Sequence, residues 1–223
     1  MFRTWNIISD LLSHDIVGHY LWEPKLLVEE LLDRGTAVRV AGHRSIKADQ
    51  FPGALTIPAF ALHHEGSVSQ DEKWQHLENF VIHNLEYQKG LNGLDPRMFP
   101  DALTLMLDVS DQQLLGAIRW FSRFEASKRP KVVFILQGLF SWPAGGRGLQ
   151  LFHEVWRDCP SFFKEQVRVC SRSEMSADRH AQILGMRPHV LPSALGPTEK
   201  EIRRTRERVG PQGGAMVVSF LPR

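Results

Sequence analysis

Four short polar segments in this chain each follow an apolar run that is predicted to be a strand, and their side chains are suited to substrate contact. They are Gly18 with His19, His43 with Arg44, Gln137 with Gly138, and Arg172 with Ser173 and Glu174. Gly18 allows the backbone to approach a bound group, so the adjacent His19 is the candidate catalytic residue. The other residues are candidate substrate-binding groups.

Each candidate has its own chemistry and its own structural alternative. His43 and Arg44 could hold a hydroxylated or anionic group, and Arg172 would bring positive charge to the same edge. The amide of Gln137, followed by a glycine, suits close approach of a ligand. Equally, His19 could be a surface loop residue, His43 and Arg44 a solvated turn, and Ser173 or Ser176 a helix cap.

The segments that must position these residues alternate between strand and helix patterns. Strands are predicted at 5–8, 37–41, 54–57, 102–109, 131–137, 167–171 and 189–191, and helices at 21–33, 71–89, 111–127, 149–164 and 176–184. Such alternation predicts an α/β fold, a doubly wound, Rossmann-like parallel sheet with helices on both faces. Ligands of open sheets bind beyond the carboxyl ends of the strands, which is where the candidate residues lie.

Several details of this prediction can be checked individually. Pro58 is expected to end the strand at 54–57, and Ser110 to cap the helix that follows the central strand. The helix at 71–89 is expected to bury an apolar stripe formed by Trp74, Leu77, Val81 and Leu85. Asp108, near the end of the central strand, is assigned a capping role in preference to ligand contact. The segments at 92–100 and 138–148 are predicted to be loops, the second a candidate lid.

Composition and motifs exclude several classes of function. A net charge of +2 without a dominant basic stripe argues against nucleic-acid binding, and the Arg-rich helix at 199–209 is interpreted as a solvated face. Two cysteines indicate a reducing compartment, and no apolar run approaches membrane-spanning length, so we expect a cytoplasmic protein. The chain contains no dinucleotide, Walker or GxSxG motif, and His63–His64 has no second ligand pair for zinc. We therefore expect no bound cofactor or metal.

Two longer stretches resemble the N-terminal half of GT-B glycosyltransferases, most closely the bacterial retaining group called family 4 or group 1. The first is GHY at 18–20, an amphipathic helix, and RGTAVRVAGHRS at 34–45, where Thr36 replaces the usual histidine. The second is VRVCSRSEMSADRHAQILGMRPHVLPSALGP at 167–197. The final MVVSFLPR is similar to the start of the family's C-terminal domain, with Pro222 in place of a glycine.

This resemblance implies an acceptor-binding domain at 1–196, and at 197–223 a linker helix and the first strand of a C-terminal donor domain that is otherwise missing. The partners implied are a sugar acceptor and a nucleotide-sugar donor, the donor held by that missing domain or by a partner chain, in polysaccharide or glycolipid synthesis. Gly18 and His19 match the loop near the reaction centre, and Arg172, Ser173 and Glu174 match the late segment facing the interdomain site. Residues 1–223 alone would then be inactive or nearly so.

Other interpretations stay open at this stage. The family often makes peripheral membrane contact, but the acidic helix at 21–33 argues against such contact here. The alternatives to a glycosyltransferase domain are a non-catalytic α/β domain that depends on a partner and an unrelated flavodoxin-like protein, which should bind a nucleotide.

Overall fold

A computed structural model describes residues 3–15, 19–62, 73–136, 153–154, 156–157 and 167–191, without the side chains of 19, 73–79 and 126. The chain divides into two compact units, Met1–Leu191 and Pro192–Arg223. All described residues belong to the first unit. The predicted boundary at 196, the tail strand and the candidate lid therefore lie outside the described residues.

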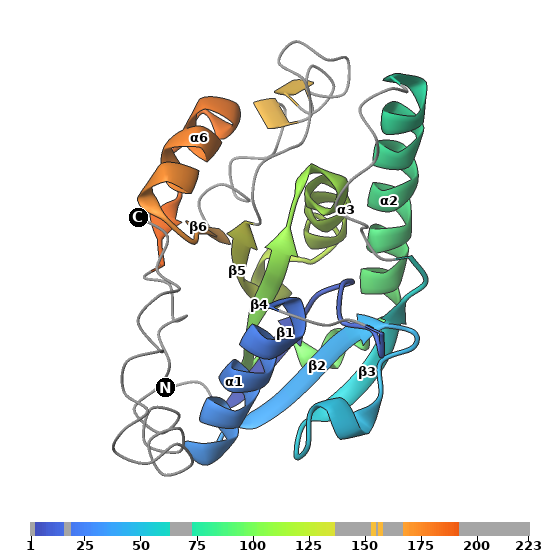
Figure 1. Cartoon of the computed structure of the whole chain (residues 1–223), viewed down its shortest axis with the longest axis vertical. Helices are drawn as coiled ribbons and strands as arrows, with labels where there is room; N and C mark the ends of the chain where they lie inside the picture. Colours follow the sequence, from blue (N-terminus) through green and yellow to red (C-terminus); the bar gives the residue numbers. More distant parts are fainter. Residues whose placement is uncertain are drawn as a thin grey trace, which may run out of the picture. The chain divides into compact units, whose positions relative to one another are not determined.

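The centre of the first unit is a sheet of seven parallel strands in the order β3-β2-β1-β4-β5-β6-β7. The strands are β1 (Thr4–Ile8), β2 (Ala37–His43), β3 (Leu55–Phe60), β4 (Ala102–Val109), β5 (Lys131–Leu136), β6 (Val167–Ser171) and β7 (His189–Val190). The chain starts in the middle, winds outward to β3, then returns to β4 on the other side of β1. The predicted doubly wound fold is confirmed, and the order reverses between β1 and β4 (Figure 1).

Helices cover the two faces of this sheet. On one face, α1 (His19–Asp33) packs Val28 and Leu31 into a core cluster with Ile7 of β1. The other face is covered by α2 (Lys73–Gly93) and α3 (Asp111–Phe121), which lie side by side (Figure 1) over a cluster that includes Ile8 and Met106. The last described helix, α6 (Glu174–Leu184), connects β6 to β7. Short 3-10 helices occur at Ala48–Gln50, Pro96–Met98 and Ala126–Lys128.

Pro58 lies inside β3, so the prediction that it ends the strand is wrong. It occupies the register position opposite Gly42 of β2. Because β3 is at the edge of the sheet, none of the described strands pairs with one side of its backbone. A residue that lacks an N–H group costs no ladder hydrogen bond on that side.

The stripe predicted for the second helix is also wrong where the structure describes it. Val81 and Leu85 are 42% and 48% exposed, while Phe80 and Tyr87 are buried. The buried face includes the polar Asn84, whose Nδ2 donates to the carbonyl of Asp111 at 2.9 Å. A buried asparagine that bonds the neighbouring helix looks like a solvent-facing residue in the sequence, and this shifts the apparent stripe.

Several boundaries of helices and strands differ from the prediction. The helix α2 continues through Gly93 into the segment predicted as a loop, and Asp95 then caps the 3-10 turn that follows it. The helix α3 ends at Phe121 and not near residue 127. The helix α6 begins at Glu174, two residues early, because the Ser173 side chain accepts a hydrogen bond from the backbone of Ser176.

A backbone contact between α2 and α3 fixes the start of α3. A Cβ atom at Gly116 would lie 2.3 Å from the carbonyl oxygen of Asn84, so only glycine permits this approach. The side chain of Asn84 then bonds α3 twice, accepting from the N–H of Gly116 and donating to the carbonyl of Asp111, both at 2.9 Å. The helix that follows β4 is thereby held in place at the carboxyl edge of the sheet.

Candidate functional site

The turns that follow β1 and β4 meet where the strand order reverses. Asp10 follows β1, and the Nε2 of Gln113 on α3 donates to both of its carboxylate oxygens, at 3.3 and 3.2 Å. The Oε1 of Gln113 accepts from the N–H of Ser110 at 2.9 Å in a capping box, which directs the Nε2 toward Asp10. Local capping of α3 therefore positions a long-range polar contact between two strand ends.

Asp108 is the residue of β4 that turns toward this edge. It has a φ of 57°, the left-handed region that aspartate tolerates better than most residues, and the pairing of β4 with β5 is irregular between Met106 and Val109. Its carboxylate lies 2.7 Å from Nη2 of Arg172. The capping role expected for Asp108 is filled instead by Ser110, whose hydroxyl accepts from the N–H of Gln112.

Arg172 connects the carboxylate of Asp108 to α1, which covers the face of the sheet opposite to α3. Its Nη1 pairs with Glu23 of α1, while its Nη2 pairs with Asp108. We call Asp10, Glu23, Asp108, Gln113 and Arg172 the switch-point cluster. The exposed fraction of the side chain is 1% for Asp108, 17% for Glu23 and 29% for Arg172, so solvent reaches mainly the Arg172–Glu23 pair.

Burial changes the proton affinity of the acids at this edge. Removal from water and the charge of Asp10 raise the pKa of Asp108 to about 7, and the nearby Arg172 guanidinium opposes that rise by favouring the charged form. Burial likewise raises the pKa of Asp111, in the first turn of α3, to about 7. The cluster can therefore exchange protons close to neutral pH.

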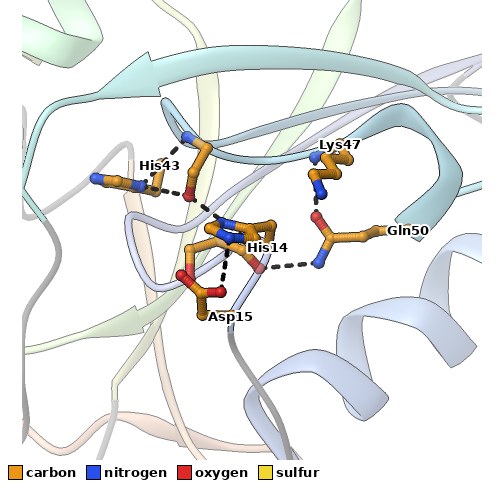
Figure 2. Close-up of polar contacts among 7 residues, drawn as sticks. His14, Asp15, His43, Lys47 and Gln50 are labelled. Atoms are coloured by element: carbon orange, nitrogen blue, oxygen red, sulfur yellow. Dashed lines mark hydrogen bonds and ion pairs between the residues drawn. The ribbon is translucent and has the colours of Figure 1, made fainter.

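A second group of polar residues lies in the loops after β1 and β2, and Figure 2 shows it. The loop cluster consists of His14, Asp15, His43, Ser45 and Gln50. The Nε2 of His14 pairs with Asp15 at 2.7 Å, and the backbone N–H of His14 donates to Oγ of Ser45 at 3.4 Å. The Nε2 of Gln50 donates to the carbonyl of Ser13 at 2.8 Å. A Cβ atom at Gly42 would lie 2.5 Å from the carbonyl oxygen of Leu12, so this glycine lets the two loops touch.

The contacts of His43 determine its tautomer. The N–H of Ser45 lies 3.3 Å from Nδ1 of His43, and an N–H can only donate. The carbonyl of Ala61 lies 3.2 Å from Nε2, and a carbonyl can only accept. His43 therefore carries its proton on Nε2, and its Nδ1 accepts from the hydroxyl of Ser45 at 2.8 Å. Both ring nitrogens bond within the protein.

The structure brings together only some of the residues singled out in the sequence. Arg172 lies in the switch-point cluster and His43 in the loop cluster, whereas Arg44 is exposed. Ser173 caps α6, and Glu174 is exposed and pairs with Arg187. His19 begins α1, but its side chain, like Gly18, Gln137 and Gly138, lies outside the described residues.

The members of the two clusters that were not selected from the sequence are Asp10, Glu23, Asp108 and Gln113 in the first and His14, Asp15, Ser45 and Gln50 in the second. Asp10 had a usable signal, because a carboxylate just after the first strand lies at the ligand-binding edge of such a sheet. Glu23 and Gln113 had none, since both look like ordinary polar positions of a helix. Within the described ranges, no group of three or more His, Cys, Asp or Glu residues could hold a metal ion. His63 and His64 lie outside those ranges.

Two further findings concern the rest of the described unit. Cys170 is buried in β6 and burial raises the pKa of its thiol, as expected of a small core residue. Among the helices that the structure describes, none is long and apolar enough to cross a membrane. Comparison of the chain with protein-family models, with curated proteins and with solved structures gave no significant match.

Proposed function

We propose that the described unit is the acceptor-side domain of a retaining, nucleotide-sugar-dependent glycosyltransferase, and that a polyhydroxylated acceptor binds at the switch-point cluster. The observation that carries this proposal is the pairing of Arg172 with two carboxylates, Glu23 and Asp108, at the point where the strand order reverses. The charge of a third carboxylate, Asp10, acts on Asp108. Open α/β sheets bind ligands at that point. The sequence resemblance to the GT-B N-terminal half supplies the reaction type.

The charges of the cluster favour hydroxyl groups over phosphates. Arg172 is already paired with two carboxylates, so little of its positive charge is available to an anionic ligand. Carboxylates accept hydrogen bonds from alcohols, and a carboxyl group with a pKa near 7, as at Asp108, can also donate one. This chemistry suits the vicinal hydroxyls of a sugar.

The donor nucleotide would be held elsewhere, by a C-terminal domain or a partner chain. We assign the described unit only the orientation of the acceptor hydroxyl. Placing that hydroxyl beside the donor in one geometry is itself a large part of catalysis in group transfer. A nucleotide should therefore bind this unit weakly or not at all.

An NMR titration of the ¹⁵N-labelled chain tests the proposal. Neutral methyl glycosides of glucose, galactose and mannose are compared with UDP and with FMN. We expect at least one glycoside to shift the amide resonances next to Asp10, Asp108 and Arg172, and neither nucleotide to do so. Shifts produced at this edge by UDP or FMN alone would instead favour a nucleotide-binding, flavodoxin-like protein.

A matched pair of variants on α1 makes the test specific. Glu23→Gln keeps the size of the side chain but removes the carboxylate that solvent reaches, and we expect glycoside affinity to fall about tenfold. Glu30→Gln is the control, because Glu30 lies on the same helix and also pairs with an arginine, Arg34, at an exposed position. Equal affinities of the two variants would remove the switch-point cluster from acceptor binding.

A further inference from the structure

Tyr87 on α2 carries a buried hydroxyl group that makes no hydrogen bond to the residues that the structure describes. The residue is 3% exposed, and its ring stacks on Phe60 of β3 at 4.9 Å with an interplanar angle of 8°. The hydroxyl has no hydrogen-bond partner in the described part of the chain. Buried tyrosines usually bond through this hydroxyl, because a polar group withdrawn from water without a partner is costly.

Contacts between α2 and α3 link the helix that carries Tyr87 to the switch-point cluster. One turn earlier on α2, Asn84 bonds the carbonyl of Asp111 at the start of α3. Two residues along α3, Gln113 bonds Asp10. Burial, then the charges of Asp10 and Asp108, raise the pKa of Tyr87 well above its ordinary value, which means that the phenol lies within the field of both carboxylates.

We propose that Tyr87 is a specificity-determining residue of the acceptor site, donating a hydrogen bond to one ligand hydroxyl whose own proton is accepted by Asp10 or Asp108. This inference rests on the proposed function and adds to it a requirement for one particular hydroxyl of the sugar. A hydroxyl group of a ligand can accept one hydrogen bond, here from Tyr87, and donate another, here to a carboxylate. A deoxy analogue would leave both unpaired and be rejected.

The hydroxyl of Tyr87 is closed off from solvent in this structure. A ligand therefore reaches it only when neighbouring side chains move. In this proposal the hydroxyl, which has no partner among the described residues, gains a hydrogen bond when the ligand binds. The energetic cost of the missing bond then falls on the unliganded state. Removal of the hydroxyl should then affect stability and binding in opposite directions.

The experiment compares the wild type with Tyr87→Phe, which removes only the hydroxyl. The probes are the methyl glycoside that binds the wild type best and its monodeoxy analogues. We expect Tyr87→Phe to unfold at an equal or higher urea concentration than the wild type. We expect it to bind the parent glycoside about tenfold more weakly than the wild type does. For the one analogue that lacks the bonded hydroxyl, we expect the two proteins to have equal affinity.

Thr36→Val is the matched control, because it removes a buried hydroxyl that has a partner. Thr36 precedes β2 at the opposite edge of the sheet, and its hydroxyl donates to the carbonyl of Leu31. We expect this variant to unfold at a lower urea concentration with unchanged glycoside affinity. The pair thus separates a structural hydroxyl from one kept for the ligand.

Each remaining outcome is decisive. A lower urea midpoint for Tyr87→Phe with unchanged affinity would show that the hydroxyl serves the fold, through an ordered water, and would overturn the inference. Unchanged stability and unchanged affinity would overturn it as well, and in both cases the proposed function would stand. A wild type that binds no glycoside would overturn the proposed function and this inference together.

Discussion

Replacing Asp111 with asparagine should stabilise the protein, and increasingly so as the pH rises. Burial raises the pKa of Asp111 from 3.8 to about 7 in the folded state. Between these two values the unfolded chain has lost the proton while the folded chain keeps it, so the folded state binds more protons and stability falls with rising pH. Asparagine cannot ionise, and its side-chain oxygen can still accept hydrogen bonds from the first turn of α3.

The size of this effect follows from the two pKa values. A shift of about 3 units corresponds to ~4 kcal/mol of unfavourable free energy once Asp111 is charged in both states. At pH 5 only ~1.7 kcal/mol of that penalty is present, because the folded state still holds its proton. The advantage of Asp111→Asn in the free energy of unfolding should therefore grow by about 2–3 kcal/mol between pH 5 and pH 8.

Urea denaturation of both proteins at pH 5, 6, 7 and 8 measures this growth directly. Asp49→Asn is the control, since it makes the same substitution at an exposed aspartate of a 3-10 helix, without the burial that acts on Asp111. A difference between wild type and Asp111→Asn that stays constant over this range would refute the reasoning. It would mean that Asp111 ionises in the folded protein as readily as in the unfolded chain.

Three further predictions concern the fold and the site. Gly116→Ala should lower the free energy of unfolding by about 3 kcal/mol, because the added Cβ would lie 2.3 Å from a carbonyl oxygen of α2. Gly93→Ala is the control and should lose no stability, since nothing lies within 4 Å of the added Cβ. Urea denaturation of both variants measures the difference. Long-range ¹H–¹⁵N NMR should find the proton of His43 on Nε2, and a proton on Nδ1 would contradict the contact with the N–H of Ser45. Arg172→Met should lower the free energy of unfolding by ~2 kcal/mol at pH 8, because Glu23 and Asp108 lose their cation. The loss should be smaller at pH 5, where Asp108 holds a proton. Equal losses at both pH values in urea denaturation would count against the raised pKa of Asp108.

Much of the fold can be predicted from the sequence, because its signals are local. The short apolar runs at 102–109 and 131–137 are predicted as strands, and the structure has β4 and β5 there. Ser110 caps the following helix as expected. Strand periodicity and helix capping depend on residues within a few positions of one another. The errors arose where distant contacts override local pattern, as at Pro58 on an edge strand and at Val81 and Leu85 on the solvent face of α2.

The switch-point cluster shows the limit of that local reading. Its members come from positions 10, 23, 108, 113 and 172, and only Arg172 was selected in advance. The sequence indicates that residues 10 and 108 follow or end strands, but the strand order that makes β1 and β4 neighbours is a property of the packed sheet. The raised pKa of Asp108 and the enclosure of the Tyr87 hydroxyl depend on burial by elements far apart in the chain. Desolvation and charge interactions act through space, so they exist only after packing has brought these groups together.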